Sequence, residues 1–159
     1  MQIEKIKTIG DAYMAAAGLP QARPGQTAAM AEFAFAMLAT LERINRTLEI
    51  PFQIRIGVHT GPVIAGVIGV NKFIYDVWGD TVNLASRLEA HGLPGRIHIS
   101  EATRQALAAE YDCEPRGLID IKGIGKIATA FLGGRKAGAA LTAAAAADDR
   151  PAARRGGVV

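Results

Sequence analysis

The chain has 159 residues, half of them apolar, which is enough for one ordinary domain with its own core. Residues 1–134 hold 13 basic and 13 acidic side chains, so the whole net charge of +3 comes from residues 135–159. A nucleic-acid-binding surface needs a basic patch on the folded part, and this balance argues against one. The single Cys113 excludes an intramolecular disulfide, and no apolar run is long enough to span a membrane.

Residues 3–19 predict a β-hairpin, because two apolar runs flank a small-residue turn at Gly10 and Asp11. A segment rich in Pro and Gly then breaks the chain. From Met30 to Leu48, apolar residues recur at spacings of three and four, which predicts an amphipathic helix.

The rest of the folded part is expected to consist of short strands and two further helices. Six segments have strand character: one from residue 54 that Gly61 and Pro62 are expected to end, 63–69, 73–78, 96–99, 113–122 and 127–132. Helices are expected over 80–90, with Asp80 or Thr81 as the cap, and over 101–109, with Ser100 as the cap.

This mixed order of helices and strands predicts an α+β domain in which helices cover a sheet. We assign residues 1–133 to this domain. Residues 134–159 are rich in Ala, Gly and Arg, and this low complexity predicts a disordered tail.

Three segments together resemble class III nucleotide cyclases: EKIKTIGDAYM at 4–14, RIGVHTGPVIAGVIG at 55–69 and YDVWGDTVNLASR at 75–87. The resemblance implies an adenylyl cyclase catalytic domain of the bacterial homodimeric type, with a ferredoxin-like, palm-type antiparallel sheet. In that family the domain opens with a strand that carries the first metal-binding Asp. No segment of the chain matches this strand, so the resemblance implies a domain that is incomplete at its N-terminus.

The resemblance also implies that each active site is built across a head-to-tail homodimer, with metal carboxylates from one protomer and nucleotide-binding groups from the other. Asp11 resembles the second metal-binding Asp, for Mg²⁺ or Mn²⁺. Lys7 and Asp76 resemble the pair that reads adenine. A cationic donor and a carboxylate acceptor match the ring nitrogen and amino group of adenine, whereas guanine reverses that pattern. Family members that use GTP typically carry Glu and Cys at these two places, so we expect ATP.

Asn83 and Arg87 stand four residues apart, which puts them on one face of the expected helix. By resemblance, Asn83 orients the ribose, and Arg87 stabilises charge on the α-phosphate as the ribose 3′-hydroxyl attacks it. Lys122 resembles the residue that neutralises the terminal phosphates.

Each of these residues also has an ordinary structural explanation. Lys7 alone is typical of a solvated strand, Asp11 of a turn, and Lys122 of an edge strand that resists aggregation. Asp76 and Asn83 could be turn and cap residues. The flanking motifs favour the functional interpretation.

Two other functions remain open. One is a non-catalytic module that binds ATP or a complete cyclase protomer and regulates it. The other is a guanylyl cyclase, which Lys7 and Asp76 disfavour. Because only one metal carboxylate is matched, we expect the chain alone to be weakly active or inactive. We expect a cytoplasmic domain without membrane contact of its own, although the parent protein could be membrane-anchored.

Overall fold

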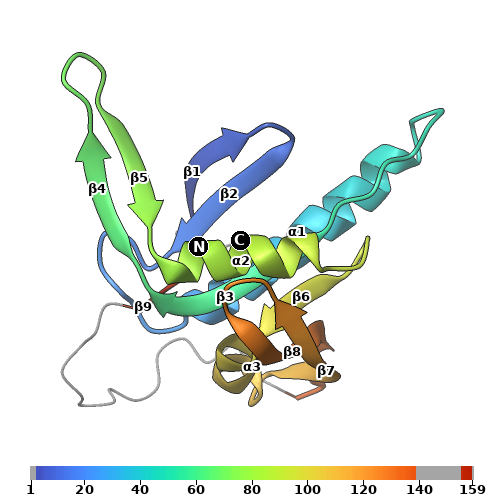
Figure 1. Cartoon of the computed structure of the whole chain (residues 1–159). Coiled ribbons are helices and arrows are strands. Elements are labelled where there is room, and N and C mark those ends of the chain that lie inside the picture. Colours follow the sequence, from blue (N-terminus) through green and yellow to red (C-terminus); the bar gives the residue numbers. More distant parts are fainter. Residues whose placement is uncertain (1–2, 139–154, 159) are drawn as a thin grey trace.

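The computed structural model describes residues 3–138 and, for the backbone, residues 155–158. Its elements in chain order are β1 Ile3–Ile9, β2 Ala12–Ala17, α1 Gln26–Asn45, β3 Ile56–Pro62, β4 Ile64–Ile68, β5 Ile74–Trp78, α2 Asp80–Ala90, β6 Ile97–Ser100, α3 Glu101–Leu107, β7 Tyr111–Ile121, β8 Gly125–Arg135 and β9 Arg155–Val158 (Figure 1).

Seven strands form one sheet in the order β1-β2-β9-β3-β6-β8-β7, and β4 pairs with β5 in a separate hairpin that projects from the body (Figure 1). β3 and β6 run parallel, and the other paired strands run antiparallel. The α+β prediction is therefore confirmed, with a mixed sheet in place of a wholly antiparallel one.

β3 lies inside this sheet and is buried on both faces. On one face Ile56 and Val58 are each 2% exposed and belong to the main core, with residues of α1, β6 and β8. On the other face α2 approaches at Gly57, where an added Cβ would lie less than 3.0 Å from the backbone of Glu89 and of Ala85. Only glycine permits this contact, so β3 determines how closely α2 can pack.

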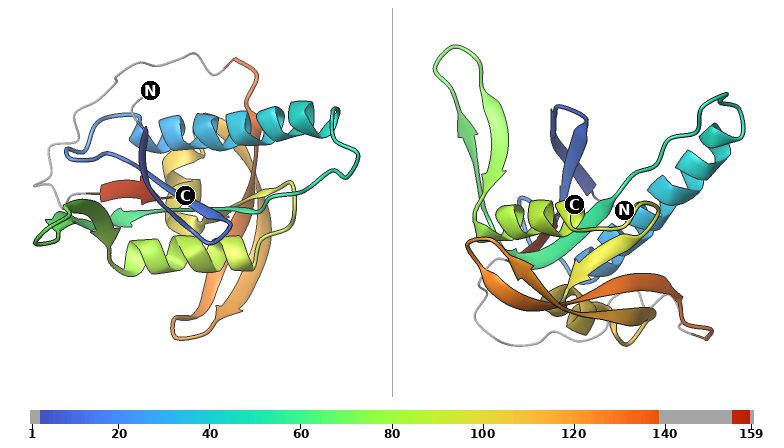
Figure 2. Two further views of the ribbon diagram at one scale, coloured as in Figure 1. Left: turned by 90° about the horizontal axis from the view of Figure 1, so that it is seen from above. Right: turned by 45° about the vertical axis from the view of Figure 1, so that its right-hand side comes forward.

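α1 and α2 run on either side of β3 when the molecule is seen from above (Figure 2). α1 contributes Met30, Ala31 and Ala34 to the main core. A second, smaller core joins β2, β5 and α2, with Met14 and Val77 among its buried members. None of the helices within residues 3–138 is both long and apolar enough to cross a membrane.

The predicted caps have different outcomes. Ser100 caps α3 as predicted, since its hydroxyl oxygen accepts a hydrogen bond from the backbone N–H of Thr103 at 3.2 Å. The prediction for α2 is wrong, because Gly79 is the N-cap and makes no side-chain cap bond. The hydroxyl of Thr81 instead donates to the carbonyl of Pro62 at 2.6 Å, which ties the start of α2 to the end of β3.

The end of the chain differs from the predicted tail. β8 continues to Arg135, and residues 155–158 form β9, which lies between β2 and β3. These residues therefore depart from the disordered segment predicted for 134–159, while residues 139–154 lie outside the described part. The last four residues of β3 pair with β9, and β3 ends at Pro62, as predicted from Gly61 and Pro62.

Replacing Gly57 with Ala should lower the free energy of unfolding by about 1–3 kcal/mol, because the new methyl group meets helix backbone that cannot move away cheaply. Urea denaturation followed by circular dichroism measures the change. Gly134→Ala is the matched control, because no atom lies within 4 Å of a Cβ built there. Equal losses in the two variants would contradict this account of β3 and α2.

Candidate active site

α2 presents one face to the core and the other to solvent. Thr81, Ala85 and Leu88 are buried, at spacings of four and three along the helix. Asn83 and Arg87 lie on the exposed side, one helical turn apart, as predicted from their spacing. Arg87 also lies in the last turn, where the helix dipole favours a cation.

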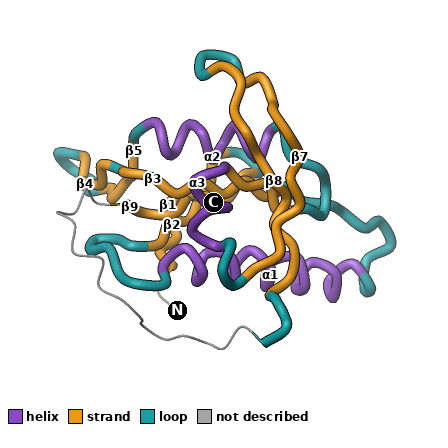
Figure 3. The backbone as a smooth tube through the Cα atoms, turned by 90° about the horizontal axis from the view of Figure 1, so that it is seen from below, coloured by secondary structure: helices purple, strands orange, loops and turns teal. Residues whose placement is uncertain are grey.

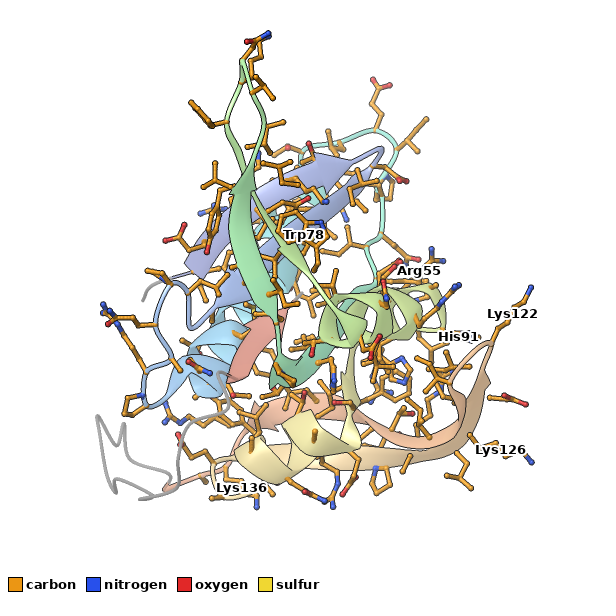
Figure 4. All side chains as sticks on the ribbon, turned by 60° about the vertical axis from the view of Figure 1, so that its left-hand side comes forward. Arg55, Trp78, His91, Lys122, Lys126 and Lys136 are labelled. Carbon is orange, nitrogen blue, oxygen red and sulfur yellow. The ribbon has the colours of Figure 1, made fainter. Side chains whose placement is uncertain are left out.

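Asn83 and Arg87 border a cleft of about 1100 Å³, and Lys122 borders the same cleft. The cleft is bounded by α2, by the β3–β4 connection at Pro62 and Val63, and by the turn between β7 and β8. Figure 3 shows the β7–β8 hairpin extending past α2, and Figure 4 shows Lys122 at its tip. Three of the residues predicted to hold the nucleotide are therefore brought together from two distant parts of the chain.

Lys7 and Asp76 form an ion pair, with 2.6 Å between the lysine Nζ and the carboxylate Oδ2. The register of β1 against β2 shifts between Lys5 and Lys7, and such a bulge re-aims the side chain that follows it. The other carboxylate oxygen of Asp76 accepts a hydrogen bond from the backbone N–H of Val77 at 2.8 Å. The structure thus brings together the two residues predicted to read the base, which are 69 positions apart.

The ammonium of Lys7 holds the pKa of Asp76 below its ordinary value, although burial acts in the opposite direction. The site therefore presents a carboxylate beside a cation at neutral pH. Residues two apart in a strand share a face, so the side chain of Asp76 lies on the same face of β5 as Trp78. Because Trp78 borders the cleft, the ion pair lies beside the cleft rather than inside it.

Asp11 lies apart from these residues. It is exposed at the turn between β1 and β2 and borders a different hollow, of about 590 Å³, beside the start of β3. In the part of the chain that the structure describes, no three His, Cys, Asp or Glu side chains are grouped so that they could hold a metal ion. Mg²⁺ and Mn²⁺ require several oxygen ligands. Asp11 offers one carboxylate for such a site, and we derive no reaction step through a metal.

His59 borders the cleft and was not among the predicted site residues. Its Nδ1 lies 2.7 Å from the hydroxyl oxygen of Ser100, the cap of α3. Burial lowers the pKa of His59, so its imidazole is neutral at neutral pH. The two partners are 41 positions apart, so no local pattern could indicate this contact.

The sequence matches the family model described as adenylate and guanylate cyclase catalytic domain over residues 1–134. It is 42% identical over 137 residues to an adenylate cyclase of Mycobacterium tuberculosis (strain ATCC 25618 / H37Rv), covering 86% of this chain and 31% of the relative. It is 44% identical over 132 residues to guanylate cyclase soluble subunit beta-2 of Rattus norvegicus, covering 82% of this chain and 19% of that protein. The chain thus spans less than a third of the length of either relative.

The fold is that of solved nucleotide cyclase domains. The crystal structure of the guanylate cyclase domain of RhGC from Catenaria anguillulae in complex with GTP superposes with a TM-score of 0.76 at 36% identity. The match covers 84% of this chain and 74% of that chain. The chain is therefore similar both to a protein named adenylate cyclase and to proteins named guanylate cyclase.

Stability should fall in mild acid. Burial lowers the pKa of both His59 and His98, so the unfolded chain, with histidine pKa values near 6.5, binds protons that the folded chain does not. The free energy of unfolding is therefore expected to decrease as the pH falls from about 7 to about 5.5. His59→Asn, which can keep a hydrogen bond to Ser100, should make that decrease smaller.

Urea denaturation at several pH values measures the slope for each variant. Asp76 does not contribute in this range, because its depressed pKa affects stability only near and below its ordinary value of 3.8. His91→Asn is the control, since His91 is exposed. An unchanged slope in His59→Asn would show that His59 is not a buried neutral group.

Proposed function

Because the chain belongs to the adenylate and guanylate cyclase catalytic domain family, we propose that residues 1–133 form an adenylyl cyclase catalytic domain. It converts ATP to 3′,5′-cyclic AMP and pyrophosphate for cyclic-nucleotide signalling. The ion pair between Lys7 and Asp76 is the observation that favours ATP as the substrate. Adenine offers a ring-nitrogen acceptor and an amino donor, which a lysine donor and an aspartate acceptor match, and guanine offers the reverse.

The ion pair does not need to break for this recognition. An ammonium group has three donors and a carboxylate has about four acceptor positions, and the pair uses one of each. The lysine side chain is 36% exposed and the aspartate side chain 12%, so part of each group remains open to a ligand. A base bound there satisfies polar groups that the wrong base leaves unpaired, which makes such a site selective.

The cleft beside the pair suits the rest of the nucleotide. Its volume of about 1100 Å³ is slightly larger than that of ordinary ligand sites. Asn83 orients the ribose, and Lys122 places a positive charge on the terminal phosphates. As the 3′-oxygen forms its bond to the α-phosphorus and the bond to pyrophosphate breaks, the Arg87 guanidinium stabilises the negative charge on the α-phosphate.

We propose a head-to-tail homodimer of the bacterial type as the active form. Asp11 borders a different hollow from the cleft, so in this proposal the Asp11 carboxylate that reaches the bound nucleotide belongs to a second protomer. The β4–β5 hairpin offers an apolar surface for such an interface. Six large apolar side chains on it or in its turn are 54% to 92% exposed: Ile64, Val67, Ile68, Val70, Phe73 and Ile74.

Divalent metal ions are used throughout this family, and we propose Mg²⁺ or Mn²⁺ as the cofactor, with Asp11 as one ligand. Since residues 3–138 contain no grouped metal ligands, the chain alone is expected to be weakly active or inactive. The same observation favours a second candidate function, in which the chain binds ATP and regulates a complete cyclase protomer without catalysing the reaction itself.

Nucleotide preference tests the base-reading pair. The wild-type chain should bind ATP at least about tenfold more tightly than GTP, and Lys7→Glu combined with Asp76→Cys should remove or reverse this preference. Titration with fluorescent analogues of both nucleotides measures the two affinities. Lys5→Glu makes the same charge change as Lys7→Glu alone, on the same strand, and should leave the preference unchanged. Equal ATP and GTP affinities in the wild type would contradict the assignment.

Turnover separates the two candidate functions. The chain is mixed with a complete adenylyl cyclase protomer whose residue at the position of Arg87 is replaced by Ala, so that only a composite site can act. Cyclic AMP should form, and Arg87→Ala in this chain should lower kcat by about 10²–10³-fold with a small effect on KM. Arg46→Ala, at the exposed C-cap of α1, is the control. Absence of cyclic AMP while the proteins associate and bind ATP would favour the regulatory function.

A further inference from the structure

The β7–β8 hairpin is supported by the rest of the sheet at its base only. β6 pairs with β8 at residues 129–132. Among the described residues, the strand residues of the hairpin beyond this point pair only with one another. A two-stranded ribbon is marginally stable by itself, so its direction depends on what holds its base. Lys122 lies at the far end of this ribbon and borders the cleft (Figure 4).

A β-bulge at Arg116 marks the end of the supported part. Pro115 lies opposite Ala130 and Gly117 lies opposite Thr129, so Arg116 is an extra residue with no partner on β8. Gly117 has a φ of 94°, in the region that favours glycine. A bulge bends its strand and re-aims a side chain. The bend of the hairpin and the direction of the Arg116 side chain are thus set at the same place.

Arg116 contacts the C-terminal end of α2. Its Nη1 donates a hydrogen bond to the backbone carbonyl of His91, the C-cap residue of the helix. The last carbonyls of a helix have no partner within the helix, and the helix dipole favours a cation there. The helix that carries Arg87 is therefore joined to the base of the hairpin that carries Lys122.

His98 and Phe131 hold the guanidinium of Arg116 in place. Burial lowers the pKa of His98, so its ring is neutral, and its Nδ1 donates to the Leu88 carbonyl of α2 at 2.8 Å. Because Nδ1 carries the proton, Nε2 is an acceptor, and it lies 3.3 Å from the Nη1 of Arg116. The guanidinium also lies over the ring of Phe131, 5.2 Å from its centroid. His98 is fully buried and Phe131 is 4% exposed, so packing fixes both partners.

The length of the hairpin amplifies any change at its base. Lys122 follows Arg116 by six positions, which correspond to about 20 Å along an extended strand. A tilt of about 10° at the bulge would therefore move the tip by about 3 Å. An ion pair requires its charged atoms to lie within about 4 Å of each other. Such a displacement is enough to break a contact between Lys122 and a phosphate.

We propose that Arg116 is a positioning residue for the nucleotide site: it joins the base of the β7–β8 hairpin to the end of α2 and so sets where Lys122 lies relative to Arg87. The inference rests on the proposed function in assigning Lys122 to the terminal phosphates of ATP. Arg116 is not among the described residues that border the cleft, so it acts through Lys122. Its loss should affect the phosphate end of the nucleotide and leave the base and ribose end unchanged.

The affinities for ATP and AMP test this role. Arg116→Ala should lower the affinity for ATP by about five- to tenfold and that for AMP by less than about twofold, because AMP lacks the terminal phosphates. Titration with fluorescent analogues of both nucleotides measures the affinities. Arg96→Ala is the matched control and should change neither, since Arg96 lies over the same Phe131 ring at 4.2 Å but pairs with Glu114. Equal losses for ATP and AMP in Arg116→Ala would overturn the proposal.

A double-mutant cycle tests whether Arg116 acts through Lys122. Lys122→Ala should produce the same selective loss for ATP, and the double variant should bind ATP about as well as Lys122→Ala alone. Arg116→Lys should lose less than Arg116→Ala, because it keeps a cation but not the planar fork that reaches two acceptors. If Arg116→Ala does not fold, Arg116→Lys takes its place in the cycle. Additive losses in the double variant would overturn the proposal.

Amide hydrogen exchange of the nucleotide-free chain tests the anchor independently of the proposed function. Exchange at residues 117–128 should be faster in Arg116→Ala than in the wild type and unchanged in Arg96→Ala. Unchanged exchange in Arg116→Ala would overturn the proposal even if the wild type binds ATP. Faster exchange in a chain that does not bind ATP would instead support the anchor and contradict the proposed function.

Discussion

The close approach of α2 to β3 at Gly57 is the contact that positions most of the site. Because residue 57 has no side chain, the helix backbone packs directly against the strand, while the neighbouring residues of β3 point into the main core. The buried face of α2 is thereby fixed, and its opposite face, with Asn83 and Arg87, is turned toward the cleft. The hydroxyl of Thr81 adds a second restraint by donating to the carbonyl at the end of the same strand.

The ion pair between Lys7 and Asp76 connects two hairpins that share no strand pairing. The pair is partly buried, and the cost of removing its charges from water offsets much of their attraction, so its value lies mainly in holding two polar groups at a fixed separation beside the cleft. Removing one partner of the pair is expected to cost more stability than removing both. Asp76 without Lys7 would be a carboxylate with a 12% exposed side chain and no cation beside it, whereas an exchange of both residues removes the charge and its partner together.

The sequence predicted those features whose information is local. The β1–β2 turn, the apolar stripe of α1 and the common face of Asn83 and Arg87 each follow from spacings of a few residues. The His59–Ser100 contact and the parallel pairing of β3 with β6 depend on residues far apart in the chain, and no single pattern contains them. β9 was missed for another reason, since composition predicts whether a segment can fold alone and not whether two strand edges will bind it.

β3 links the cleft to β9, because its residues both border the cleft and pair with β9. His59 and Pro62 border the cleft, and both residues lie opposite residues of β9 in the sheet. The pairing with β9 therefore restrains this wall of the cleft. His59 also connects this wall to α3, because it hydrogen-bonds to Ser100, which lies on the neighbouring strand β6 and caps α3.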